Sequence, residues 1–180
     1  MLSFFGRSAQ FRRELETNWN RLYRVVYALS HDQPLAEDLV QTTVEAALVN
    51  HRKIPDSESL ERWLFKVLLN KWRDHCRTRK FHTPIDDVDI VQHGSLELNS
   101  EHRETVDRVY TAMRQLSEEH REGLSLISVD NFSYKQVAYI LDLPVGTVMS
   151  RLSRSRQQLR KLLDAFVVNV NSGTAIRRIK

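Results

Sequence analysis

Five residues between positions 63 and 77 recur at helical spacing and combine side chains suited to a nucleic acid. Trp63, Lys66, Asn70, Arg73 and Arg77 follow one another at i, i+3, i+7, i+10 and i+14, so they share one face of a helix. Cations on such a face can follow a phosphate backbone, and amide or aromatic groups can meet an unstacked base. This 63–77 stripe predicts a surface for single-stranded DNA, although Trp63 could equally belong to the core.

A second basic face is predicted in the helix expected from about Thr147 to Phe166. The side expected to pack on Val137, Ala138 and Leu141 consists of Val148, Leu152, Ser155, Leu159 and Leu162. The opposite side is polar and cationic and consists of Ser150, Ser153, Arg154, Gln157 and Lys161. Such a face can enter a major groove, whereas the flanking Arg151, Arg156 and Arg160 are better placed for phosphates.

A short helix and a tight turn precede this basic helix. Ser133 and Gln136 fit a capping box that begins a helix over 134–141. Asp142-Leu143-Pro144 ends it, with Asp142 where a left-handed backbone is expected. The arrangement predicts a helix-turn-helix, and a solvated basic face on an ordinary helical bundle is the alternative.

The remaining elements are also expected to be helices. The 180 residues include only 5 Gly and 4 Pro, which favours helix over a fold of strands and turns. Apolar periodicity and Pro34 predict helices over about 11–29, 34–48, 60–79, 101–115 and 117–129. The predicted fold class is all-α, with two small helical domains joined by a flexible acidic linker.

The charge is unevenly distributed along the chain. The net charge is +4, but residues 81–107 contain seven acidic residues and one basic residue, so that segment carries −6 and the rest +10. Two basic blocks thus flank an acidic middle. A polyanionic partner is expected, with scattered solvated helix faces as the alternative.

Several function classes are disfavoured. The sequence has no long apolar run typical of a membrane span and no secretory signal, so a cytoplasmic protein is expected. Cys76 is the single cysteine and is expected to be a small buried hydrophobe. The seven histidines are dispersed, and there is no Gly-rich phosphate loop or nucleophile elbow. We therefore expect no enzyme, no cofactor and no metal site.

The segment Tyr134–Arg156, with Pro144-Val145-Gly146-Thr147-Val148 and Ser150-Arg151-Leu152, resembles region 4 of the extracytoplasmic-function (ECF) sigma factors of bacterial RNA polymerase. The resemblance implies recognition of the promoter −35 element. The implied base readers are Met149, Ser150, Ser153 and Arg154. Met149 departs from the family, which commonly has a basic residue at this position. The implied −35 site comprises Thr147, Met149, Ser150, Arg151, Ser153, Arg154, Arg156, Gln157 and Lys161.

The segment Ala36–Thr43 resembles the region 2 helix of the same family. The resemblance implies binding to the core polymerase, at the clamp helices of the β′ subunit, with the β subunit as a further partner. The implied contact residues are Asp38, Leu39, Gln41, Thr42 and Glu45. The family commonly has Glu at the position of Thr42.

Residues 62–74 resemble the part of region 2 that recognises and melts the −10 element. The helix and the expected loop before it, Lys53–Leu60, are implied to hold the opened strand. The implied −10 site comprises Lys53, Asp56, Ser57, Ser59, Trp63, Lys66, Asn70, Lys71, Arg73 and Arg77.

The expected organisation is region 2 at 8–80, the linker at 81–107, region 4 at 108–166 and a frayed tail at 167–180. The linker charge would suit mimicry of nucleic acid or simple solubilisation. The resemblance also implies an anti-sigma factor, which as a membrane protein would hold the chain at the inner membrane. Functionally, the alternative is a stand-alone helix-turn-helix regulator, for which no heptad dimerisation segment is evident.

Overall fold

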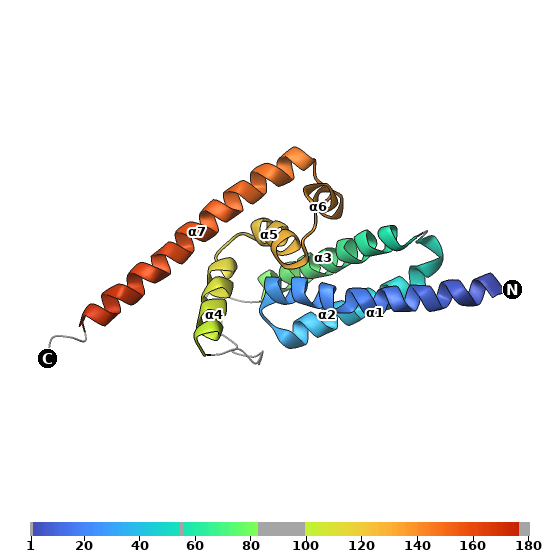
Figure 1. Ribbon diagram of the computed structural model, residues 1–180, viewed down its shortest axis with the longest axis horizontal. Coiled ribbons are helices and arrows are strands. Elements are labelled where there is room, and N and C mark those ends of the chain that lie inside the picture. Colours follow the sequence, from blue (N-terminus) through green and yellow to red (C-terminus); the bar gives the residue numbers. More distant parts are fainter. Residues whose placement is uncertain (1, 55, 83–99, 177–180) are drawn as a thin grey trace.

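The computed structural model describes residues 2–54, 56–82 and 100–176, and within these ranges the chain is helical with no strand. The elements are α1 (Leu2–Ser30), α2 (Gln33–Asn50), the 3-10 turn η1 (His51–Lys53), α3 (Ser57–His82), α4 (Ser100–Arg114), α5 (Glu118–Asp130), α6 (Tyr134–Leu141) and α7 (Val145–Ile176). The predicted all-α class is confirmed. The two ends of the chain lie at opposite ends of the molecule (Figure 1).

Helices α1, α2 and α3 form the N-terminal half, in which they pack side by side (Figure 1). The residues that α1 and α3 turn inward, including Leu22, Val25, Leu64 and Leu68, are fully buried. Asp32 caps α2, because its Oδ1 accepts a hydrogen bond of 3.0 Å from the Leu35 amide, and Pro34 lies in the first turn as predicted.

Helices α4 to α7 form the C-terminal half. The predicted capping box at the start of α6 is present, with both Ser133 and Gln136 in their reciprocal hydrogen bonds. Asp142 has φ 58° and ψ 48°, which confirms the left-handed residue in the turn before α7. Gly123 lets α5 approach α7 closely, since a Cβ there would lie 3.3 Å from Leu152 Cδ2.

The two halves share one hydrophobic core. Phe65 of α3 and Phe132, which follows α5, are both buried, and their rings meet edge to face at 4.7 Å. The cluster of buried hydrophobic residues runs continuously from one half into the other. Each half is small for an independent core, so the other half supplies apolar surface that it needs.

Several element limits differ from the sequence prediction. Helix α1 begins before position 11, α3 begins at Ser57, and α7 continues through much of the tail that was predicted to fray. Residues 100–107 of the predicted linker lie in α4, while residues 83–99 lie outside the described residues. Leu48, two residues before the end of α2, is 46% exposed although it is apolar.

Candidate nucleic-acid and polymerase interfaces

The polar face of α7 is open. Thr147, Met149, Ser150, Ser153, Arg154, Arg156, Gln157 and Lys161 are all exposed. Ser150 donates a hydrogen bond of 3.0 Å to the Thr147 carbonyl, and Arg156 Nη1 donates one of 3.3 Å to the Tyr134 hydroxyl. Arg151 differs from the others, because it pairs with Glu119 of α5 at 3.0 Å and its side chain is 19% exposed.

The opposite side of α7 holds this face in place. Val148 and Leu152 are each 1% exposed and Ser155 is fully buried, as predicted, and they face a core that includes Val137 and Leu141 of α6. The Ser155 hydroxyl donates a hydrogen bond of 2.8 Å to the Arg151 carbonyl, so it has a partner although it is buried. The buried side fixes the rotation of α7, so the exposed residues project as a rigid set.

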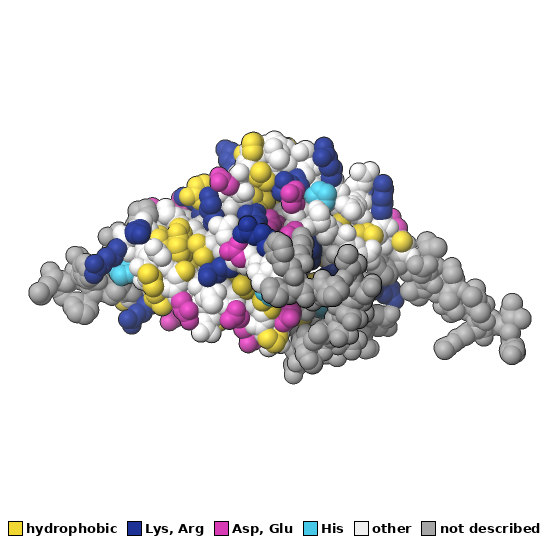
Figure 2. Space-filling model, turned by 180° about the vertical axis from the view of Figure 1, so that it is seen from behind, with side chains coloured by type: hydrophobic (Ala, Val, Ile, Leu, Met, Phe, Trp, Pro, Cys, Tyr) yellow, Lys and Arg dark blue, Asp and Glu magenta, His cyan; other side chains and the backbone are white. Residues whose placement is uncertain are grey.

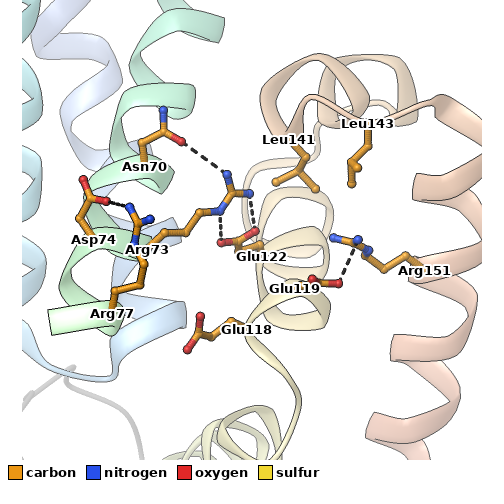
Figure 3. Close-up of a pocket in the computed structure, with 10 residues that line it drawn as sticks. All are labelled: Asn70, Arg73, Asp74, Arg77, Glu118, Glu119, Glu122, Leu141, Leu143 and Arg151. Atoms are coloured by element: carbon orange, nitrogen blue, oxygen red, sulfur yellow. Dashed lines mark hydrogen bonds and ion pairs between the residues drawn. The ribbon is translucent and has the colours of Figure 1, made fainter. Parts of the chain in front are cut away.

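The 63–77 stripe is partly covered by the C-terminal half (Figure 3). Arg73 forms a two-pronged pair with Glu122 of α5, with Nε to Oε1 at 2.8 Å and Nη2 to Oε2 at 2.7 Å. Lys66 Nζ lies 3.6 Å from Asp142 Oδ2 in the helix-turn-helix turn. Asn70 is exposed between these two cations, and Arg77 pairs with Asp74 on α3 itself.

A cleft of about 670 Å³ separates this part of α3 from α5 and α7 (Figure 3). Its wall contains Arg73 and Arg77 on one side and Glu118, Glu119 and Glu122 on the other. The hydrogen bonds that Arg73 donates to Glu122, together with the negative charges of the nearby carboxylates, raise the pKa of Arg73. On the face shown in Figure 2, Lys and Arg side chains are interspersed with Asp and Glu instead of forming one continuous basic patch.

The remaining predicted −10 residues lie at and before the start of α3. Asp56 caps the helix, because its Oδ1 accepts a hydrogen bond of 2.7 Å from the Ser59 amide, and these bonds lower the pKa of Asp56. Ser57 and Ser59 therefore belong to the first helical turn, which corrects the prediction of a loop extending to Leu60. Lys53 is exposed, Trp63 and Lys71 are half-buried, and Pro55 lies outside the described residues.

The outer face of α2 carries the predicted polymerase contacts. Asp38, Gln41 and Glu45 are exposed, and Gln41 Nε2 donates 3.0 Å to Glu45 Oε1. Thr42 is half-buried, and its hydroxyl donates a hydrogen bond of 3.2 Å to the Leu39 carbonyl. Leu39 is only 6% exposed, so its side chain contributes to the core and not to this surface.

Comparisons with known proteins agree with this division into two units. The family model described as Sigma-70 region 2 matches residues 15–82, and the one described as Sigma-70, region 4 matches residues 107–159. The ECF RNA polymerase sigma factor SigM of Bacillus subtilis is 32% identical over 153 residues, which are 82% of this chain and 91% of that protein. The chain belongs to the ECF sigma factors. Sigma factors regulate transcription and are not known as enzymes.

Other relatives support the same family. The ECF sigma factor EcfG of Rhodopseudomonas palustris is 34% identical over 142 residues, which are 76% of this chain and 75% of that protein. Among solved structures, the sigma factor RpoE of Bartonella quintana, in complex with the anti-sigma factor NepR, is similar with a TM-score of 0.70 and 32% identity. That likeness covers 86% of this sigma factor and 97% of RpoE.

The sequence interpretation missed residues of this sigma factor that join the two halves. Glu122 and Asp130 are carboxylates of α5 whose side chains are each 2% exposed, and each binds an arginine of the N-terminal half. The one local signal is that Glu122 precedes the small and apolar run Gly123–Ile127, where an acidic side chain needs a buried partner. The arginines that supply that partner are distant in sequence and carry no such signal.

Among the residues that the structure describes, no three His, Cys, Asp or Glu side chains gather as metal ligands. No helix in the described ranges is long and apolar enough to cross a membrane. Cys76 is half-buried and packs against the core of the N-terminal half.

Proposed function

We propose that this ECF sigma factor directs promoter-specific initiation by dividing three contacts among three helices. The outer face of α2 binds core RNA polymerase, at the β′ clamp helices and with the β subunit as a further partner. Helix α7 reads the −35 duplex, and the 63–77 stripe holds the melted −10 strand. The observation that carries the proposal is the exposed polar face of α7, presented on a helix whose other side is buried.

The α7 face supports base reading by its chemistry. Arg154 has a planar guanidinium that can bind guanine edges in two places, while Ser150 and Ser153 are short enough to let the helix approach the groove floor. Arg156 is exposed at the flank of this face, where phosphates lie. A stand-alone regulator is less well supported, because the family match includes region 2 as well as the helix-turn-helix.

An anti-sigma factor is the proposed controlling partner. The support is the similar RpoE structure, which is a complex with the anti-sigma factor NepR. If the controlling protein is embedded in the inner membrane, it would hold this sigma factor there until released.

Run-off transcription with purified core polymerase tests the proposal. A pool of genomic upstream fragments serves as template, with core polymerase alone as the control. We expect discrete transcripts that require the sigma factor, together with its co-purification with core. No transcript and no core binding would refute the assignment.

A variant of α2 tests the polymerase surface separately. Asp38→Ala, Gln41→Ala and Glu45→Ala together should abolish co-purification with core, because they remove the exposed polar groups of that face without touching its buried side. Glu37→Ala is the matched control: it is also exposed on α2 but lies outside the proposed contact set. If both variants bind core equally well, another surface makes the contact.

A further inference from the structure

Two cations of the 63–77 stripe that would hold a DNA strand, Lys66 and Arg73, are already engaged by carboxylates of the C-terminal half, and Lys66 also lies near an aromatic ring of that half. We propose that the free sigma factor is self-inhibited: α5 and α6 of its own C-terminal half occupy the −10 face, and melted DNA binds there only when the two halves separate. The inference rests on the proposed role of the stripe and adds a regulatory state to it.

The pair between Arg73 and Glu122 carries most of the argument. Two parallel hydrogen bonds of 2.8 and 2.7 Å join the guanidinium to the carboxylate. A guanidinium binds a phosphate through the same fork of N–H groups. Glu122 therefore stands where a DNA phosphate would bind, so the two ligands of Arg73 exclude each other.

A second contact covers the other end of the stripe. The Tyr139 ring of α6 lies 5.0 Å from the Arg62 guanidinium and 5.8 Å from the Lys66 ammonium, within the range of cation–π attraction. Asp142, at the end of the same helix, lies 3.6 Å from Lys66. A strand that followed the stripe from Lys66 to Arg73 would have to displace both contacts.

The closed arrangement is anchored away from the stripe as well. Arg21 of α1 donates to Asp130 from Nε at 3.0 Å and from Nη2 at 2.7 Å, and it also pairs with Glu61. Arg121 Nη1 reaches the Leu29 carbonyl at 3.3 Å. With the Phe65–Phe132 contact, these bonds make closure a built interface and not a chance approach of two surfaces.

The energetics suit a reversible device. Burying an ion pair costs desolvation free energy that largely offsets its Coulombic gain, so such a pair specifies an arrangement more than it stabilises it. When the halves separate, water solvates Glu122 and DNA can replace it on Arg73. Binding of polymerase and DNA can then open the molecule.

The test uses the full-length protein with dyes at Asn20→Cys and Asp164→Cys in a Cys76→Ser background, so that energy transfer between the dyes measures separation of the halves. Binding of a fluorescent twelve-nucleotide oligo(dT) measures access to the stripe. The test variant is Asp130→Asn, which weakens closure without altering any stripe residue or its direct partner. Glu122→Gln is a second test variant, and Glu37→Gln is the control for loss of one negative charge.

We expect both test variants to lower energy transfer and to bind oligo(dT) about tenfold more tightly than wild type, with Glu37→Gln unchanged. Oligo(dT) should lower energy transfer in the wild-type protein too, since coupling between two equilibria is reciprocal. Circular dichroism establishes that each variant is folded. If the variants separate the halves without a gain in affinity, or if Glu37→Gln gains as much, self-inhibition is overturned.

A further substitution separates this proposal from the proposed function. Lys66→Ala in the Asp130→Asn background should lose the gained affinity if the stripe is the DNA surface. If it keeps that affinity while the energy transfer still reports separation, the strand binds elsewhere. The −10 assignment then fails, and the self-inhibition that depends on it fails with it. If Lys66→Ala abolishes oligo(dT) binding while energy transfer shows that the two halves never separate in any variant, the −10 assignment stands and only the self-inhibition is wrong.

Discussion

The two helices proposed to meet DNA differ in how available their faces are. On α7 the side chains that would enter the major groove are exposed, and within the described part of the chain Arg151 is the one predicted contact that is ion-paired to another helix. On α3 the corresponding cations Lys66 and Arg73 both contact carboxylates of the other half. A face can therefore have suitable residues and still be covered, and under the proposed function reading of the duplex and binding of the opened strand would be separate steps.

Phe132→Ala is expected to change the accessibility of α3 relative to α7 more than any other substitution. Phe132 is 4% exposed and packs edge to face on Phe65 across the two halves, so its truncation should cost about 3–5 kcal/mol of the free energy of unfolding. The loss of this contact should also uncover α3 and make it as accessible as α7. Urea denaturation and oligo(dT) binding check both expectations.

Tyr134→Ala is the control for Phe132→Ala, because Tyr134 is 38% exposed and lies on the C-terminal half alone. It should leave stability and oligo(dT) binding nearly unchanged. A loss below about 1 kcal/mol for Phe132→Ala would mean that the halves do not depend on each other.

Arg154→Ala is expected to have the next largest effect, and only on the open face. Removal of an arginine that binds a base edge should cost about 1–3 kcal/mol at one base pair of the −35 element and relax specificity there. Because α7 is exposed already, the cost should be the same in the Asp130→Asn background. Transcription from templates with single −35 changes is the measurement; a uniform loss across all templates would make Arg154 a phosphate contact.

Glu119→Gln should have a smaller effect and remove the one exception on α7. The pair with Arg151 is largely at the surface, so the free energy of unfolding should change by less than about 1 kcal/mol. The released Arg151 should strengthen duplex binding a few-fold and steepen its salt dependence by about one phosphate. Arg151→Gln in the same background should reverse the gain, and no change in salt dependence would show that Arg151 stays away from DNA.

The smallest effect concerns pH and the contact of His31 with the C-terminal half. His31 stacks on Tyr110 of α4 at 4.4 Å and contacts Tyr27, and its Nδ1 is buried without a hydrogen-bond partner. Burial lowers the pKa of His31, although Asp107 opposes this shift and Arg114 adds to it. The unfolded chain, with an ordinary histidine pKa of about 6.5, therefore binds this proton more readily than the folded one.

It follows that the free energy of unfolding is unaffected by His31 above about pH 7 and decreases as the pH falls below about 6.5 toward the folded-state pKa. His31→Asn, which tolerates the positive φ of 52°, should remove that part of the slope. Urea midpoints at several pH values measure it. An identical slope in both proteins would assign the acid sensitivity to another group.

The parts of this fold that follow from local patterns were predictable. The capping box at Ser133, the left-handed turn at Asp142 and the buried side of α7 each depend on residues a few positions apart, and all three are present. The polar face of α7 followed from helical periodicity, whereas the full contact sets on α2 and α7 were implied by the family resemblance. Only the buried Leu39 and the half-buried Thr42 and Arg151 depart from those sets.

The contact between the halves was not predictable from such patterns. Arg21 and Asp130 are 109 positions apart and Arg73 and Glu122 are 49 apart, so no periodicity relates them. Phe65 is fully buried because the Phe132 ring of the other half packs on it, and that partner is 67 positions away in the sequence. Most of the acidic linker lies outside the described residues, and among the described residues Glu122 and Asp142 are the carboxylates of the C-terminal half that contact the stripe.

The close packing at Gly123 links α5 to α7 within the C-terminal half. Gly123 follows Glu122 directly, and its close approach to Leu152 ties the inhibiting carboxylate to the recognition helix as one body. A movement of α7 that preserves this contact would also move Glu122 relative to Arg73 of α3. Under the proposed function, α7 and α3 contact two separate promoter elements, so a shift of α7 that carries Glu122 away from Arg73 would couple the two contacts through this one packed residue.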